Sequence, residues 1–287
     1  MSLRPVGSSS TQRALQRDST SQPQSTPVAD EPASTGWKPR TGATPRHVVN
    51  ETKPPRLDEV AERAVLEGVR KPGKLITLAE GDASKPLAVT IHGINGDPDD
   101  VQPFIDDAAA SGKTTLTFCY DDQYRRLTQS SKELASQLGK WIDQNPGRPL
   151  EISAHSMGSR VMLSALDRLN QQGKLTMPVE LRMVAPPLGG YGSANMAALA
   201  PKFIGERIAG VQPGKDMGTW SRFQRELEEL KLPANVNVTV FTGGRDDVVD
   251  STGDRFKRVV DGLGARVVHF PDADHMSAIE KAAEQLR

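Results

Sequence analysis

The chain of 287 residues carries 36 Lys and Arg side chains and 36 Asp and Glu side chains, so its formal net charge is zero. This balance argues against a nucleic-acid partner, whose phosphates call for an excess of basic residues. The sequence contains no run of about 18 apolar residues that could span a bilayer, which leaves a transient contact with a membrane surface as the alternative. Cys119 is the one cysteine, so an intrachain disulfide is excluded.

The composition changes sharply along the chain. In residues 1–50, Ser, Thr, Pro, Gln and Gly fill 27 positions, whereas Leu, Ile, Val and Phe fill six. So little apolar surface cannot offset an ordering entropy of roughly 1–2 kcal/mol per residue. We therefore expect residues 1–55 to form a disordered tail and residues 56–287 to form one domain.

Beyond the tail, short apolar or β-branched segments alternate with segments of helical periodicity. Strands are predicted at residues 74–79, 87–91, 114–120, 150–154, 179–185, 236–241 and 266–270. Helical spacing of apolar residues occurs at 134–142, 161–169 and 223–230, a last helix is expected at 277–286, and the acidic run 97–100 is expected to cap a helix. This alternation predicts an α/β fold, with a mostly parallel sheet covered by helices on both faces.

The most informative stretch is the junction between the fourth strand and the following helix. Small residues, Ala154 and Gly158, lie two positions on either side of Ser156. A sharp strand-to-helix turn would bring these positions close together and lift the serine hydroxyl above the sheet. It would also place the Met157 N–H at a helix N-terminus, where it stabilises negative charge. The alternative is that Ser156 simply caps the helix.

Several motifs carry a resemblance to a known family. The segment 154–158 (AHSMG) resembles the nucleophile elbow of small bacterial lipases, and 89–96 (VTIHGING) is similar to the strand and oxyanion loop of lipases and esterases. The proline–glycine turn at 185–190 resembles that of lipases and inositol-deacylase-like enzymes, and 241–249 and 272–275 match the acid and histidine loops. The chain thus resembles the α/β-hydrolase superfamily, and the resemblance implies the α/β-hydrolase fold.

The resemblance also implies roles for particular residues. The family's chain order of serine, acid and histidine points to Ser156 as nucleophile, Asp246 as the acid and His275 as general base. Asp247 remains a rival for the acid, and His275 could instead cap the last helix. By resemblance, the oxyanion is held by the N–H groups of Ile94 and Met157.

The remaining histidines are interpreted as structural. His269 lies in the last predicted strand and is expected to be a packed side chain, His92 is expected to hold its loop, and His155 is expected to pack. Because the histidines are scattered without ligand spacing, we expect no metal and no cofactor. Asp121 and Asp122 precede the serine and are interpreted as loop residues.

Residues 188–217 form an amphipathic insertion that could be a lid offering apolar surface to an acyl chain, or an ordinary surface helix. Within it, Asp216 stands where the lipases more usually have serine. The sequence thus predicts a serine hydrolase that cleaves an acyl or lipid ester, with an acyltransferase or a non-catalytic binding protein as alternatives. Arg4, Arg13 and Arg17 lie in an acid-free stretch that resembles the leaderless secretion signals of bacterial effectors. The alternative location is the cytoplasm.

Overall fold

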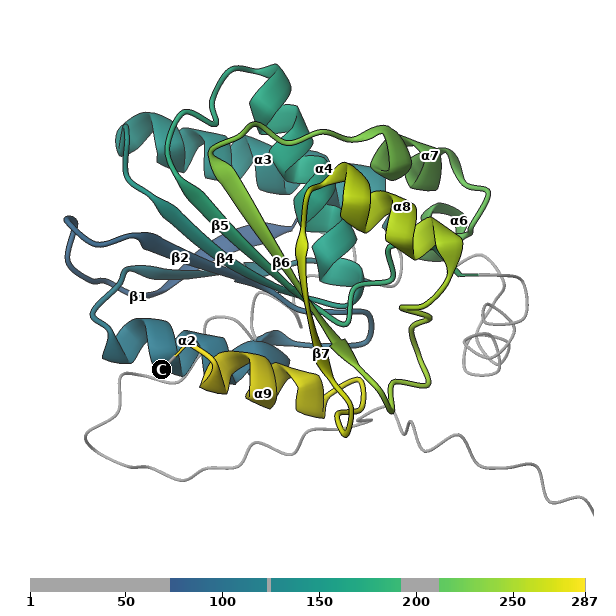
Figure 1. The fold of residues 1–287 in the computed structure, drawn as a ribbon. Coiled ribbons are helices and arrows are strands. Elements are labelled where there is room, and N and C mark those ends of the chain that lie inside the picture. The colour runs from purple at the N-terminus through teal and green to yellow at the C-terminus, as the bar shows by residue number, and fades with distance from the viewer. Residues whose placement is uncertain (1–72, 123–124, 192–211, 287) are drawn as a thin grey trace, which may run out of the picture. The chain divides into compact units, whose positions relative to one another are not determined.

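The structure, a computed structural model, describes residues 73–122, 125–191 and 212–286 (Figure 1). The predicted tail at 1–55, its boundary with the domain and most of the predicted lid at 188–217 lie outside the described residues. In the part that is described, no helix is long and apolar enough to cross a membrane.

The described core of the domain is a seven-stranded sheet with the strand order β1-β3-β2-β4-β5-β6-β7. All seven predicted strands are present, and their bounds agree with the prediction to within two residues. They are β1 (Lys74–Ala79), β2 (Leu87–Ile91), β3 (Thr115–Cys119), β4 (Leu150–His155), β5 (Val179–Val184), β6 (Val236–Gly243) and β7 (Arg266–Phe270). β1 runs antiparallel to β3, and the other neighbours are parallel, so the mostly parallel sheet is confirmed.

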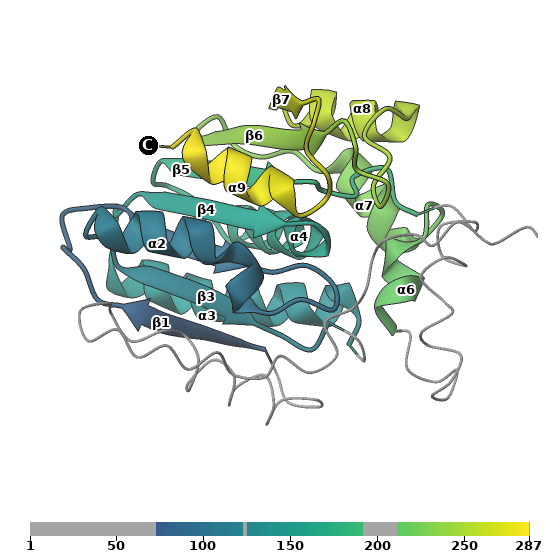
Figure 2. The same cartoon turned by 90° about the horizontal axis from the view of Figure 1, so that it is seen from below.

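Helices cover both faces of this sheet, as Figures 1 and 2 show. One face carries α3 (Leu127–Gln144), α4 (Met157–Gln171), α7 (Arg222–Glu229) and α8 (Asp254–Gly262), whereas the opposite face carries α2 (Gln102–Ala110) and α9 (Ser277–Glu284). A short helix, α6 (Gln212–Met217), precedes α7. The acidic run caps a helix as predicted, because Asp97 forms a capping box at the start of η1 (Pro98–Val101).

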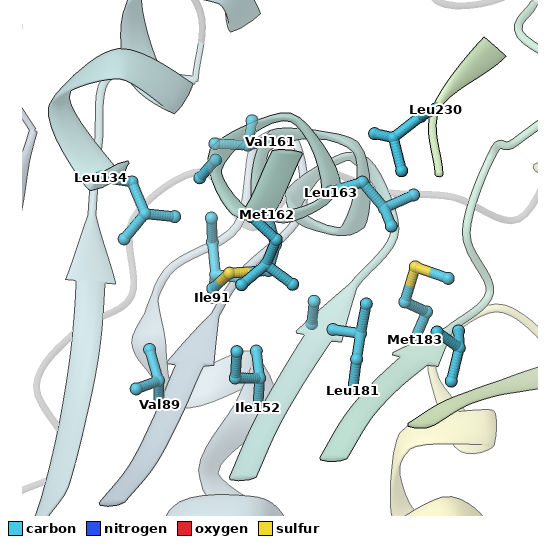
Figure 3. Packing of buried hydrophobic residues seen from close by; sticks show 14 of the residues in the cluster. Val89, Ile91, Leu134, Ile152, Val161, Met162, Leu163, Leu181, Met183 and Leu230 are labelled. Atoms are coloured by element: carbon cyan, nitrogen blue, oxygen red, sulfur yellow. The ribbon is translucent and has the colours of Figure 1, made fainter. Parts of the chain in front are cut away.

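Alternate side chains of the strands enter two apolar cores, one on each face. In β5, Leu181 and Met183 join the core beneath α4, whereas Val184 joins the core beneath α2 and α9. Figure 3 shows Ile152 of β4 between Val89 and Leu181, below the side chains of α4. Burial on both faces explains why the central strands are apolar almost throughout.

The parallel strands end at one edge of the sheet. The register pairs Ile91 with Ala154, His155 with Val184, and Gly243 with Phe270. The loops that follow β2, β4, β5, β6 and β7 therefore begin side by side, at the edge where open α/β sheets bind ligands.

Asp122, just after β3, supports the loop that follows β2. Burial raises the pKa of its carboxyl group to about 7, and hydrogen bonds from the backbone N–H groups of Asn95 and Gly96 oppose this rise. Asp122 was interpreted from the sequence as an ordinary loop residue. In the fold it connects two loops of the carboxyl edge, because β3 lies beside β2 in the sheet.

Truncation of Ile152 tests the central packing. Its side chain has no exposed surface, so Ile152→Ala should lower the free energy of unfolding by about 2–5 kcal/mol, and Ile152→Val by only about 0.5–1.5 kcal/mol. Urea denaturation followed by circular dichroism measures both. Equal losses for the two variants would contradict the close packing around β4.

Asp122 predicts a pH dependence of stability. The unfolded chain loses this proton near the ordinary pKa of 3.8, whereas the folded protein holds it up to about 7. Since the folded state binds more protons in this range, its Asp122 contribution to stability falls as the pH rises from about 4 to about 7. Asp122→Asn has no carboxyl group to titrate, so its free energy of unfolding should rise relative to that of the wild type between about pH 4 and about pH 7, as measured by urea denaturation. If the free energies of unfolding of the two proteins changed in parallel with pH, the raised pKa of Asp122 would be excluded.

Candidate active site

The turn between β4 and α4 has the sharp geometry that the sequence predicts. Ser156 adopts φ 49° and ψ −126°, a left-handed conformation that is costly for a residue with a Cβ atom. Ser156 occupies the N-cap position of α4, but its side chain makes no capping hydrogen bond to a described residue. The hydroxyl is therefore not used as a helix cap, and the capping alternative is wrong.

Close backbone contacts hold the loop after β2 against this turn. A Cβ atom at Gly158 would lie 2.3 Å from the carbonyl oxygen of His92, so only glycine fits there. A Cβ atom at Gly93 would lie 3.5 Å from Ser156 Oγ. The N–H of Met157 is in the first turn of α4, where it has no partner within the helix. Ile94, the next residue after Gly93, thus lies in the loop that passes over the serine.

The structure distinguishes the two adjacent acidic residues. Asp246 Oδ2 lies 2.9 Å from His275 Nδ1, and Asp246 Oδ1 accepts hydrogen bonds from the N–H groups of Val248 and Val249 at 2.9 and 3.0 Å. Asp247, in contrast, is exposed to solvent. Both side chains of the Asp246–His275 pair are more than nine-tenths buried. The pairing with Asp246 orients the imidazole, and the capping alternative for His275 is wrong because Met276 is the N-cap residue of α9.

Two glycines allow the acid loop to approach the histidine loop. A Cβ atom at Gly243 would lie 2.4 Å from the carbonyl oxygen of Ala273, and one at Gly244 would lie 2.4 Å from that of Pro271. Asp274 fixes the next turn, since its carboxylate accepts the N–H groups of Met276 and Ser277 at 3.0 and 2.7 Å. The position of His275 is thus determined by backbone contacts on both sides.

His155 connects the serine turn with the histidine loop. Its Nε2 donates to the carbonyl oxygen of His275 at 3.2 Å, and the two ring centroids are 4.8 Å apart. Burial holds the pKa of His155 well below its ordinary value, so the ring is neutral. No hydrogen bond joins Ser156 to His275 among the bonds of the described residues. Catalytic hydrogen bonds are often long in unliganded enzymes and shorten only with substrate.

The other two histidines have different surroundings. His92 is buried, its Nδ1 is 2.8 Å from the carbonyl oxygen of Gly93, and its ring stacks on Tyr120, so it holds its loop as predicted. Burial lowers its pKa. His269 is exposed and contacts the hydroxyl of Thr242. The prediction that it is packed was wrong, because β7 lies at the end of the strand order and three of its five residues are exposed.

A buried arginine of α4, which was not identified from the sequence, joins this helix to the turn after β5 and to α6 and α7. Arg160 has no exposed surface and donates to the carbonyl oxygens of Pro187 and Asp216 and to Gln224 Oε1, at 2.8 to 2.9 Å. Burial lowers its pKa to about 10, at which it still carries its charge at neutral pH. An arginine inside the otherwise apolar run of this helix was the available signal.

The same network accounts for Asp216. Its carboxylate accepts Arg126 Nε at 3.0 Å, and its side chain is almost completely buried. The aspartate that stands in place of the more usual serine thus forms an ion pair that attaches α6 to the start of α3. Within the described ranges, no group of three or more His, Cys, Asp and Glu side chains is placed to hold a metal ion.

Comparison with known proteins agrees with this architecture. A family model described as alpha/beta hydrolase of unknown function (DUF900) matches residues 108–189, from the end of α2 to the turn after β5. A search of curated protein sequences gave no significant match.

Solved structures with a similar fold include a mature lipase of Bacillus licheniformis, with 16% identity and a TM-score of 0.56 over 75% of this chain and 96% of that chain. Alpha/beta hydrolase domain-containing protein 10 from mouse has 14% identity and a TM-score of 0.50 over 75% of this chain and 91% of that chain. At such identities the likeness concerns the fold. The sheet order, the turn at Ser156 and these relatives together establish that the chain has the α/β-hydrolase fold, as the resemblance to lipases and esterases implied.

Proposed function

We propose that the protein is a serine hydrolase that cleaves a carboxylic ester with an acyl or lipid group. The observation that carries this proposal is the buried hydrogen bond between Asp246 and His275, next to the strained turn that presents Ser156. A serine hydroxyl is a weak nucleophile until a base takes its proton, and the base needs a third group to orient it. The similarity to a lipase supports an acyl ester as substrate.

Each residue has a defined role in the proposed reaction. His275 Nε2 takes the proton of Ser156 as the serine oxygen attacks the ester carbonyl, and Asp246 stabilises the resulting imidazolium through Nδ1–H. The N–H groups of Ile94 and Met157 bind the oxyanion. Collapse of the tetrahedral intermediate releases the alcohol with the proton from His275 and leaves an acyl-serine. Water, activated by the same histidine, then releases the carboxylic acid.

Labelling with a fluorophosphonate probe tests the nucleophile. The wild type should be labelled, and Ser156→Ala should not be, because the probe reacts only with an activated serine. Ser164→Ala is the matched control, since Ser164 lies on α4 and its hydroxyl contacts Ser131. Labelling that persists in Ser156→Ala would rule out the assignment. An unreactive wild type that binds a ligand would instead indicate a non-catalytic binding protein.

The neighbouring acids provide a second test. Asp246→Asn should lower kcat for a nitrophenyl ester by up to about 10⁴-fold, since a carboxamide favours the wrong imidazole tautomer. Asp247→Asn should leave kcat nearly unchanged because Asp247 is exposed. Steady-state kinetics across short and long acyl chains measures both and also defines the preferred acyl group. A larger loss of kcat in Asp247→Asn than in Asp246→Asn would refute the assignment of Asp246. If an acylated alcohol were the main product, the protein would be an acyltransferase.

A further inference from the structure

Tyr191 is held rigidly at the carboxyl edge of the sheet, just after the turn that follows β5. Its N–H donates to the carbonyl oxygen of Met217 at 2.9 Å, and its own carbonyl oxygen accepts the N–H of Thr219 at 3.1 Å. These bonds form a parallel bridge between Tyr191 and Gly218. The preceding residue, Gly190, has φ 72°, and Thr219 leaves no room for a Cβ atom there. The position of the Tyr191 backbone, from which the side chain extends, is therefore fixed by these contacts.

Tyr191 is only 3% exposed, and its buried hydroxyl group has no hydrogen-bond partner among the described residues. The Ser156 side chain lies close enough to lower the pKa of this hydroxyl by a hydrogen-bonding interaction, although the two groups do not form a hydrogen bond of normal geometry. The charge of Asp246 raises the same pKa, and that of Arg160 lowers it. Burial, with Asp246 as the next cause, raises the pKa of Tyr191 above its ordinary value. The group therefore keeps its proton and remains a donor.

An unpaired buried hydroxyl destabilises a protein, and a phenylalanine would fill the same space without this cost. The tyrosine therefore needs an explanation other than packing. The reactive group that interacts with it is the hydroxyl of Ser156, whose oxygen in the resting state still carries its own proton. An interaction that is weak in the resting state and strengthens when charge develops is the kind that accelerates a reaction.

We propose that the Tyr191 hydroxyl donates a hydrogen bond to Ser156 Oγ when that oxygen carries negative charge. This inference rests on the proposed function. Charge develops on Ser156 Oγ twice, when His275 removes its proton during attack and when the serine leaves the acyl-enzyme during hydrolysis. In both steps the proton of Tyr191 stays on the tyrosine. His275 passes the serine proton to the leaving alcohol, and in the second step it returns to the serine a proton that it has taken from water. Tyr191 acts as a fixed donor, like the N–H groups of an oxyanion hole.

Tyr191→Phe tests this role because it removes the hydroxyl and keeps the ring. We expect the rate of fluorophosphonate labelling and kcat both to fall by at least about tenfold, with KM largely unchanged. The melting temperature should stay the same or rise, because the unpaired group is gone. Tyr120→Phe is the matched comparison for stability. Tyr120 donates to the carbonyl oxygen of His92 at 3.0 Å, so its loss should lower the melting temperature.

The outcomes separate this inference from the proposed function. If the wild type shows no labelling that depends on Ser156, both are wrong. If the wild type is labelled and Tyr191→Phe reacts at the same rate, only the role of Tyr191 is refuted. If Tyr191→Phe raised KM and left kcat unchanged, Tyr191 would contact the substrate, and the donor role would be refuted. If it lowered both kcat and the melting temperature, the role of Tyr191 would be structural.

Discussion

The contact between Gly158 and the carbonyl oxygen of His92 is the constraint on which the site depends. It joins the first turn of α4 to the loop after β2, and a single methyl group at residue 158 would separate them. Because the two segments are in contact, the turn at Ser156 must be tight enough to force a positive φ at the serine. The same contact places Gly93 above the serine side chain. Ser156 and the loop after β2 are therefore positioned by one close backbone contact, and the large apolar cores on either side of the sheet keep that contact from relaxing.

Polar groups around this contact fall into two sets. Asp246 and Arg160 form several hydrogen bonds each, which makes them rigid supports despite the cost of burying charge, although Nε of Arg160 has no partner among the described residues. Close to Ser156, however, the Nδ1 of His155 and the hydroxyl of Tyr191 are buried without partners among the described residues. Strain and unsatisfied polar groups are expected to gather where a protein gives up stability for function. The strained backbone of Ser156 and the unpaired polar groups near it therefore support a functional site at this position, independently of any resemblance to known families.

Much of the fold could be predicted from the sequence because the relevant signals are local. Strands buried on both faces are apolar throughout, and the small residues on either side of Ser156 reflect a steric demand within five positions. The choice between Asp246 and Asp247 could not be derived, since it depends on which carboxylate the turn directs toward a loop 29 residues further along the chain. The exposure of His269 depends on the place of β7 in the strand order, and the roles of Arg160, Asp122 and Tyr191 depend on partners from other elements. Periodicity contains no information about such distant contacts.

The bridge between Tyr191 and Gly218 affects how well the protein can tolerate changes in the length of the chain between these two residues. Residues 191 and 217–219 are fixed to each other and, through Arg160 and Asp216, to the body of the domain. The two ends of this bridge are therefore close in space although they lie about 25 residues apart in the sequence. Closing a longer or shorter loop between two such positions changes the free energy only slowly with length. A change in the number of residues between these two anchored positions should accordingly cost little stability, because each anchor is held by its own hydrogen bonds.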